Sequence, residues 1–352
     1  MNPAMTANSD RWVQLTSFAN LYTAWRDASR GKRHRQSVSR FACDLEEELL
    51  LLQHQLQTDS YRPGPYRTFT IYERKPRIIS AAPFRDRVVH HALMNVLDPQ
   101  LDGMMYPHSF ACRVGKGVHA AVDRYEMCAR RFVYVLKMDV QRYFPSIDQH
   151  ILFRQLCKVV PEPGVQRLIG HILRSGSATA ADDNDDAPFA TGLPIGNLTS
   201  QTFANWYLTP FDHWLSQHLP AGNYLRYVDD LWLFADDKRV LWAVAQQAKT
   251  YLAGRLKLTV HPRKTALRRT MEKVDVLGYH VSRHRRWLRP DNGHRFRRRL
   301  RGMAKAYSRG EVSVEDLKPR IASWIGHAMH GETRGLRRAI FGVVRFRRAT
   351  AP

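Results

Sequence analysis

The sequence of 352 residues lacks a hydrophobic run of the roughly 18 apolar residues that a membrane-spanning helix needs. Its N-terminal stretch also lacks the apolar core of a secretory signal peptide. We therefore expect a cytoplasmic protein with no membrane partner. Cysteine is scarce, with 4 residues that are widely spaced and form no C-x-x-C pair. A zinc site or a dithiol redox motif is accordingly not predicted.

Acidic residues are few compared with basic ones. Lys and Arg number 55 against 32 Asp plus Glu, which gives a formal net charge of +23 and a pI of about 10.3. The chain is 44% hydrophobic, so it can build a folded core. In a folded chain such an imbalance favours a polyanionic partner, because phosphate contacts release condensed counterions. Nucleic acid is the leading candidate.

Hydrophobic periodicity predicts a mixed α and β protein. The N-terminal region contains helical patterns, with Ser17 as an N-cap and a second helix from about residue 39 to Leu56. The nearly continuous apolar run 132–138 predicts a buried strand, and 224–234 predicts two strands about a tight turn. A further helix is expected after Ser313, where Ser-Val-Glu-Asp resembles a capping box.

Three aspartates stand where their carboxylates can be held at the edge of a sheet. Asp139 follows the predicted buried strand, and Asp229 and Asp230 lie at the turn of the predicted hairpin, between apolar flanks. Adjacent carboxylates repel each other unless a cation binds them, and two divalent ions about 3.5–4 Å apart serve phosphoryl transfer. The alternative is that Asp doublets simply form turns, as we expect for Asp236 and Asp237 in their polar surroundings.

These aspartates lie in two segments that resemble motifs of reverse transcriptases. Lys-Met-Asp-Val-Gln-Arg-Tyr-Phe-Pro-Ser-Ile, residues 137–147, is similar to the family's first palm motif, and Tyr-Val-Asp-Asp, residues 227–230, to its second metal motif. The resemblance implies an RNA-directed DNA polymerase with a two-metal-ion mechanism that uses two Mg²⁺ ions, or Mn²⁺ in their place. The implied metal site comprises Asp139, Val140, Asp229 and Asp230.

Further segments extend the resemblance over about residues 10–345 and imply other site residues. Lys264 resembles a lysine that the family places near the triphosphate as a proton donor, which adds it to the catalytic aspartates. Phe144 falls where the family has an aromatic side chain that excludes a ribose 2′-hydroxyl. The implied dNTP-binding residues are Lys75, Arg77, Phe144, Ile195, Gly196 and Gln201. Plainer interpretations are a solvated basic turn for the two cations and core packing for Phe144 and Ile195.

The segment 192–201 narrows the resemblance within the family. Most reverse transcriptases have Gln and Pro at the positions that Ile195 and Gln201 occupy here. Together with Ala-Ser-Trp-Ile-Gly-His-Ala at 322–328, this departure resembles the enzymes of diversity-generating retroelements, a bacterial and phage group similar to group II intron reverse transcriptases. The resemblance implies error-prone copying of a template RNA, chiefly at adenines, into cDNA that diversifies a target gene. It also implies a small basic accessory protein that forms a pentameric barrel.

The stretch 283–301 is strongly basic, with Trp287 and Phe296 interleaved among its arginines. Most charge runs are solvated faces. In a chain with polymerase motifs, however, we expect this stretch to grip a nucleic-acid duplex. The arginines chosen as candidate contacts are Arg295, Arg297, Arg298 and Arg299.

The expected fold is α+β and follows the right-hand polymerase plan. We expect N-terminal helices and fingers over residues 1–130, a palm with an antiparallel sheet over 131–282, and a small basic helical thumb over 283–352. The expected partners are template RNA, the RNA/cDNA duplex and dNTPs. Two alternatives stay open, namely a defence-associated reverse transcriptase with a different template and product, and a non-catalytic RNA-binding scaffold with the same fold.

Overall fold

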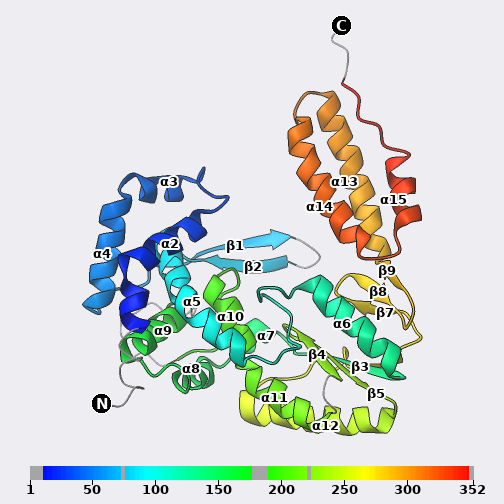
Figure 1. Cartoon of the computed structure of the whole chain (residues 1–352), viewed down its shortest axis with the longest axis horizontal. Coiled ribbons are helices and arrows are strands. Elements are labelled where there is room, and N and C mark those ends of the chain that lie inside the picture. The colour runs from blue at the N-terminus through cyan, green and yellow to red at the C-terminus, as the bar shows by residue number, and fades with distance from the viewer. Residues whose placement is uncertain (1–10, 73–75, 177–188, 220–222, 349–352) are drawn as a thin grey trace.

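The computed structural model of the chain describes residues 11–72, 76–176, 189–219 and 223–348. Helices of the N-terminal part, a central sheet with its covering helices, and a C-terminal helical group that stands apart make up the molecule (Figure 1). Its helices include α2 (Phe18–Ser29), α3 (Gln36–Cys43), α4 (Leu45–Gln57), α5 (Phe84–Met104), α6 (Val118–Arg131), α7 (Tyr143–Ser146), α8 (Gln149–Cys157), α9 (Pro163–Ser175), α10 (Leu198–Tyr207), α11 (Thr209–His218), α12 (Lys238–Leu256), α13 (Pro290–Ser308), α14 (Val314–Met329) and α15 (Arg334–Phe341). Its strands include β1 (Arg67–Tyr72), β2 (Pro76–Ala81), β3 (Tyr134–Asp139), β4 (Tyr224–Tyr227), β5 (Asp230–Ala235), β6 (Ala266–Arg269), β7 (Val274–Val276), β8 (Tyr279–Val281) and β9 (Arg286–Leu288). Among the described helices, none is long and apolar enough to cross a membrane.

The N-terminal helices follow the local signals of the sequence, with one difference. Ser17 caps α2, because its hydroxyl oxygen accepts a hydrogen bond from the backbone N–H of Asn20 at 3.2 Å. The helix expected over about 39–56 is divided into α3 and α4 by Asp44, whose φ of −113° and ψ of 38° lie outside the helical region. Aspartate competes for backbone hydrogen bonds and favours such boundaries. Further along, Ser313 forms the predicted capping box, in which Asp316 is the partner.

The central sheet has the strand order β4-β5-β3-β6, and all of its pairings are antiparallel. Side chains of successive strand residues point to opposite faces. Leu136 and Leu233 accordingly join a core with α10, α11 and α12, whereas Val135 and Trp232 join a second core with α6 and the C-terminal elements. Because both faces are covered, the apolar residues of β3 point to both faces of the sheet, and the charged Lys137 and Asp139 lie toward its C-terminal end. The predicted α+β class with an antiparallel sheet is confirmed.

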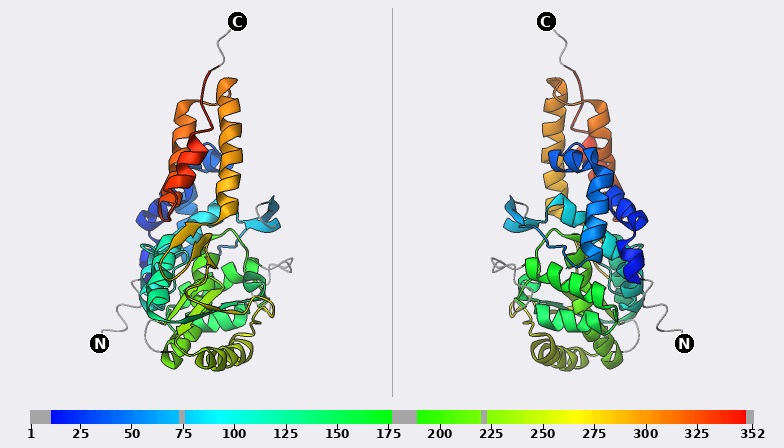
Figure 2. Two further views of the ribbon diagram at one scale, coloured as in Figure 1. Left: turned by 90° about the vertical axis from the view of Figure 1, so that its right-hand side faces the viewer. Right: turned by 90° about the vertical axis from the view of Figure 1, so that its left-hand side faces the viewer.

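The C-terminal helices stand on a small sheet. Strands β7, β8 and β9 pair antiparallel, and the turn between β7 and β8 places Leu277 and Gly278 at φ values of 50° and 95°. From this sheet α13, α14 and α15 project away from the central sheet, as both side views show (Figure 2). Phe296 and Trp324 stack with ring centroids 3.9 Å apart and hold α13 against α14. The basic stretch 283–301 includes strand β9 and the first part of helix α13.

The hairpin of β1 and β2 is fastened to the loop before α10. The Ser80 N–H donates to the Ile195 carbonyl at 2.9 Å, and the Asn197 side-chain amide donates to the Ser80 carbonyl at 3.2 Å. Between these two contacts, Gly196 has φ +121°, and a Cβ there would lie 2.8 Å from Cγ2 of Ile79. Only glycine combines this conformation with so close an approach. Gly196 therefore determines how closely the hairpin meets the loop.

We predict that Gly196→Ala lowers the thermal unfolding midpoint, because alanine meets both a disfavoured φ and the Ile79 methyl group. The destabilisation should exceed about 1 kcal/mol, the scale of a glycine replaced at positive φ. Gly254→Ala is the matched control, since a Cβ at Gly254 in α12 has nothing within 4 Å. Helix propensity favours alanine there by roughly 0.5–1 kcal/mol. An unfolding midpoint of Gly196→Ala at or above that of the wild type would contradict the proposed contact.

Candidate active site

Asp139 meets the adjacent pair Asp229 and Asp230, which lies far along the chain, at one end of the central sheet. Asp139 is the last residue of β3 and Asp230 the first of β5, and the antiparallel register places their Cα atoms opposite each other. Asp229 occupies the turn between β4 and β5, and its carbonyl accepts a hydrogen bond from the Val140 N–H at 3.1 Å. Strand pairing alone thus gathers the carboxylates that the sequence singled out.

Two lysines form ion pairs with these carboxylates. The Lys264 ammonium lies 2.8 Å from both carboxylate oxygens of Asp139. It comes from the segment between α12 and β6, which is anchored by the His261 N–H donating to the Asp139 carbonyl at 2.7 Å. From β3 itself, the Lys137 ammonium reaches across to β5 and lies 2.8 Å from Oδ1 of Asp230. Positive charge is therefore already directed at two of the three aspartates.

The electrostatics of Asp229 are the most perturbed of the three. Burial raises its pKa to about 6, and the neighbouring carboxylates of Asp230 and Asp139 act in the same direction. Burial also raises the pKa of Asp230, although the Lys137 ammonium opposes that shift. Holding these groups ionised together is unfavourable, and added positive charge at this place would relieve the repulsion.

The donor set suits a hard divalent cation, because such ions prefer carboxylate and carbonyl oxygens. Val140 directly follows β3, and because its side chain is a hydrocarbon, its backbone carbonyl is the only oxygen it can offer. Within the described ranges, no three His, Cys, Asp or Glu side chains are arranged as a metal cluster. In this arrangement the ammonium groups of Lys264 and Lys137 hold the oxygens of Asp139 and Asp230.

Four of the residues expected to bind dNTP belong to neighbouring segments that contact one another. Phe144 lies in α7, is half-buried against the core, and its carbonyl accepts from the Leu193 N–H at 3.0 Å. The same loop continues to Ile195 and Gly196, which contact β2, the strand that carries the exposed Arg77. Gln201 is exposed on α10, and Lys75 lies outside the described residues.

The arginines expected to bind nucleic acid lie on α13. The side chains of Arg295, Arg298 and Arg299 are exposed, whereas Arg297 is partly buried. Arg295 pairs with Asp291 one turn earlier, at 3.4 Å, and Asp291 is the only acid in that helix. The exposed face of α13 is therefore strongly positive.

Sequence reasoning missed two cations beside the site. Lys137 bonds Asp230 and lies 5.3 Å from the centroid of the Trp232 ring. Arg226, in β4 directly before the turn, is fully buried and pairs with Asp212 at 2.6 Å. A signal was present, because each is a cation between apolar neighbours of a strand, where an unpaired charge would be costly. Their partners could not be read from the sequence.

Comparisons with known proteins identify the family of the chain. Residues 68–281 match the family described as reverse transcriptase (RNA-dependent DNA polymerase). The chain is 22% identical over 280 residues to Protein YkfC of Escherichia coli (strain K12), covering 68% of this chain and 73% of YkfC. It is 24% identical over 174 residues to the putative COX1/OXI3 intron 1 protein of Saccharomyces cerevisiae, covering 49% of this chain but 21% of that protein.

The structure is also similar to that of apo telomerase from Candida tropicalis truncated from its C-terminal domain. The TM-score is 0.50 at 12% identity, covering 67% of this chain and 58% of the telomerase chain. A likeness at this identity concerns the fold alone, which is a polymerase fold with antiparallel sheets. The family match covers more than half of the chain and includes Asp139, Asp229, Asp230 and Lys264. The chain therefore belongs to the reverse transcriptase (RNA-dependent DNA polymerase) family.

Proposed function

We propose that this chain is an RNA-directed DNA polymerase that makes error-prone cDNA from a template RNA in a diversity-generating retroelement. The observation that carries the polymerase proposal is the meeting of Asp139, Asp229 and Asp230 at one end of a buried sheet, beside Lys264. A non-catalytic RNA-binding scaffold would have no need to keep mutually repelling carboxylates together.

Reverse transcriptase domains generally use divalent metal ions, and the oxygen donors at this site fit them. We propose that Asp139, Asp229, Asp230 and the Val140 carbonyl hold two Mg²⁺ ions, or Mn²⁺ in their place. Such ions, when bound, neutralise charge that develops on the reacting phosphate. Lys264, whose side chain is half-exposed beside Asp139, would donate a proton toward the leaving pyrophosphate in this proposal. Arg77 on the exposed hairpin would contact the triphosphate of the incoming dNTP.

The three parts of the molecule take the roles of a right-hand polymerase in this proposal. The N-terminal helices and the β1–β2 hairpin act as fingers over residues 1–130, and the central sheet acts as the palm over 131–282. Helices α13, α14 and α15 act as the thumb over 283–352, with the basic face of α13 toward the RNA/cDNA duplex. A positive helix face beside a template is the arrangement that phosphate contacts favour.

Asp139→Asn and Asp229→Asn are each expected to abolish primer extension on an RNA template while leaving RNA affinity nearly unchanged. The reason is that the carboxylates would hold the catalytic ions, whereas affinity comes from the basic surface. Asp237→Asn is the matched control, because Asp237 caps α12 at an exposed position where asparagine caps equally well. Near-normal extension by either site variant would refute the proposed catalytic centre.

The same Asp229 variant offers a measurement that does not depend on activity. Because folding raises the pKa of Asp229 to about 6, the folded state binds this proton more tightly than the unfolded chain, and stability from this group is lost as the pH rises through that value. Asp229→Asn should therefore raise the unfolding midpoint of the metal-free protein at about pH 8 and raise it less at about pH 4.5, which lies between the pKa values of the unfolded and folded states. A variant that is less stable at both pH values would indicate misfolding.

The retroelement assignment rests on the loop before α10. Ile195 there replaces the Gln of most family members, and its carbonyl already bonds the Ser80 N–H, so the residue lies where fingers and palm meet. An isoleucine side chain can neither donate nor accept a hydrogen bond near a nascent base pair. The absence of one hydrogen bond worth roughly 0.5–1.5 kcal/mol would relax selectivity severalfold. The small basic pentameric accessory protein belongs to the same proposal.

We predict that wild-type cDNA carries more errors opposite template adenine than opposite other bases, and that Ile195→Gln lowers the error rate severalfold. Sequencing of cDNA made by each protein measures both quantities. Val240→Gln is the control, because Val240 is an exposed β-branched residue on α12, outside the proposed site. An equal error rate at all four bases in the wild type would exclude a retroelement enzyme and favour another reverse transcriptase, such as a defence-associated one.

Replacing Arg295, Arg298 and Arg299 with Gln should weaken binding to a template-primer duplex and flatten its salt dependence. Removing a cation that neutralises one phosphate lowers the slope of log affinity against log salt by about 0.7–0.9. Lys238, Arg239 and Arg255 on α12 supply a control of equal charge, at the opposite end of the molecule from α13 (Figure 1). A salt slope that falls as much in the α12 control as in the α13 variant would indicate general charge, not a duplex-binding face.

A further inference from the structure

A fully buried ion pair lies beneath the turn that carries Asp229. Arg226 of β4 and Asp212 of α11 both have side chains with 0% exposure, and the guanidinium Nη2 is 2.6 Å from Oδ2 of Asp212. Burial by itself would lower the pKa of Arg226, but the Asp212 carboxylate raises it above its usual value. The pair is thus charged and deprived of water, an arrangement that survives only with complete hydrogen bonding.

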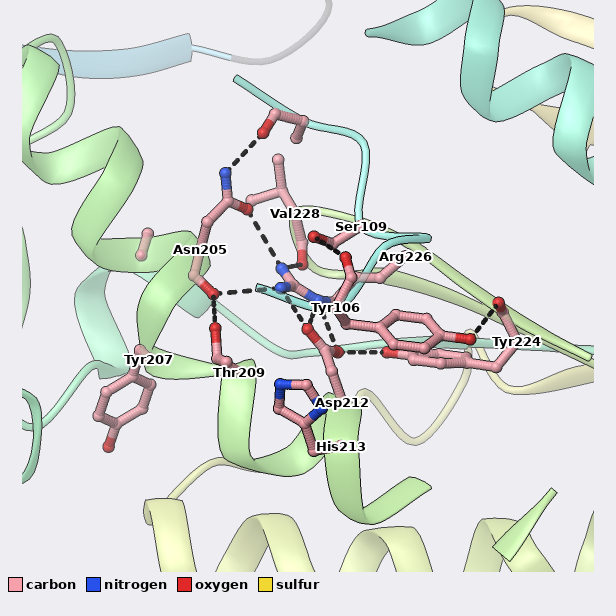
Figure 3. A network of polar contacts seen from close by, with 12 residues as sticks. Tyr106, Ser109, Asn205, Tyr207, Thr209, Asp212, His213, Tyr224, Arg226 and Val228 are labelled. Atoms are coloured by element: carbon pink, nitrogen blue, oxygen red, sulfur yellow. Dashed lines mark hydrogen bonds and ion pairs between the residues drawn. The ribbon is translucent and has the colours of Figure 1, made fainter. Parts of the chain in front are cut away.

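The guanidinium of Arg226 uses each of its five N–H groups (Figure 3). The Nε–H and one N–H of Nη2 donate to the Asp212 carboxylate. The other N–H of Nη2 donates to the Asn205 backbone carbonyl at 3.1 Å. Nη1 donates to the Asn205 side-chain oxygen at 3.2 Å and to the Val228 carbonyl at 3.1 Å. One rigid group therefore ties α10, α11 and the turn of the hairpin together.

The backbone at Val228, which accepts one of these bonds, is strained. Val228 has φ 56°, in the left-handed region that a β-branched residue disfavours. Such a conformation persists only where its surroundings impose it. The Val228 carbonyl belongs to the peptide group that leads into Asp229, so the bond from Arg226 fixes the plane of that peptide. On its other side, the Asp229 carbonyl is held by the Val140 N–H.

We propose that Arg226, oriented by Asp212, is a positioning residue for the reaction: it holds the Val228–Asp229 peptide and so directs the Asp229 carboxylate toward Asp139 and Asp230. It is buried and touches neither substrate nor the reacting atoms. The inference rests on the proposed polymerase function and specifies how its metal-binding turn is held. Groups that orient metal ligands typically affect metal affinity or activity about 10–100-fold when they are removed.

The first test is Arg226→Lys, which keeps the positive charge beside Asp212 but loses the planar fork that reaches Asn205 and Val228 at the same time. Mg²⁺ is titrated while the thermal unfolding midpoint is followed, because an ion that binds the folded state raises that midpoint. We expect the Mg²⁺ concentration for half-maximal stabilisation to rise about tenfold or more, kcat for primer extension to fall similarly, and KM for dNTP to change little.

Because a lysine cannot reproduce the paired bonds to Asp212, a second variant removes both charges. Arg226→Met with Asp212→Leu replaces the buried pair by apolar side chains of similar volume, an exchange that is often neutral for stability. It also leaves the Val228 carbonyl without its guanidinium donor. We expect the double variant to fold with a lowered unfolding midpoint, because the Tyr224 hydroxyl and the Asn205 side-chain oxygen also lose their partners, and to retain the same rise in half-saturating Mg²⁺.

Tyr224→Phe is the matched control for a purely structural role. The Tyr224 hydroxyl donates to Oδ1 of Asp212 at 2.8 Å within the same buried network, yet its removal leaves the bond from Arg226 to Val228 in place. This variant should lower the unfolding midpoint without moving the Mg²⁺ concentration for half-maximal stabilisation. A shift in that concentration equal to the one in Arg226→Lys would show that any damage to the network suffices, and would overturn the positioning role.

The remaining outcomes separate this inference from the proposed function. Unchanged half-saturating Mg²⁺ in whichever Arg226 variant folds would overturn the inference, and so would failure of both variants to fold, since the pair would then serve the fold alone. A wild-type protein that Mg²⁺ does not stabilise and that extends no primer would contradict the proposed function instead. If Mg²⁺ stabilises the wild type, the wild type extends a primer, and the Arg226 variants need more Mg²⁺, then the inference and the proposed function are both supported.

Discussion

Repulsion between carboxylates is the constraint on which the centre of this protein depends. Asp139 and Asp230 lie opposite each other in paired strands, and Asp229 adjoins them with a pKa raised to about 6. The surrounding residues can be understood as the means of holding these like charges together. Lys264 and Lys137 form ion pairs with two of the carboxylates, and the sheet, which has a core on each face, fixes their backbone positions. The fold thus holds three mutually repelling carboxylates close together, and a bound cation would reduce their repulsion.

Local signals in the sequence predicted the elements well. The cap at Ser17, the capping box at Ser313 and the apolar run that became β3 depend on neighbouring residues, so one stretch of chain contains the necessary information. The break at Asp44 was missed because the hydrophobic stripe continues across it and only the backbone angles interrupt the helix. The positions of the three aspartates at strand ends were predicted for the same reason, since the residues of each adjoining strand define that strand locally.

Long-range contacts could not be obtained in this way. Nothing near Arg226 in the sequence identifies its partners. Arg226 lies in strand β4, whereas Asp212 and Asn205 come from helices α11 and α10. The left-handed Val228 runs against the preference of valine, so local propensity predicts the opposite conformation. Likewise, the bond between Ser80 and Ile195 joins a hairpin to a loop far along the chain. Strand pairing and tertiary packing decide these features, and they lie beside the site.

Strand β3 has a consequence for insertions and deletions. Its side chains alternate between two different cores, so adding or removing one residue would send each side chain to the wrong core. Adding or removing two residues would restore the alternation but move Asp139 along the strand, away from its place opposite Asp230. Substitutions at the core positions can be absorbed by repacking, whereas changes in length cannot. Related chains should therefore vary in the identity of the core residues of β3, while the number of residues in the strand stays constant.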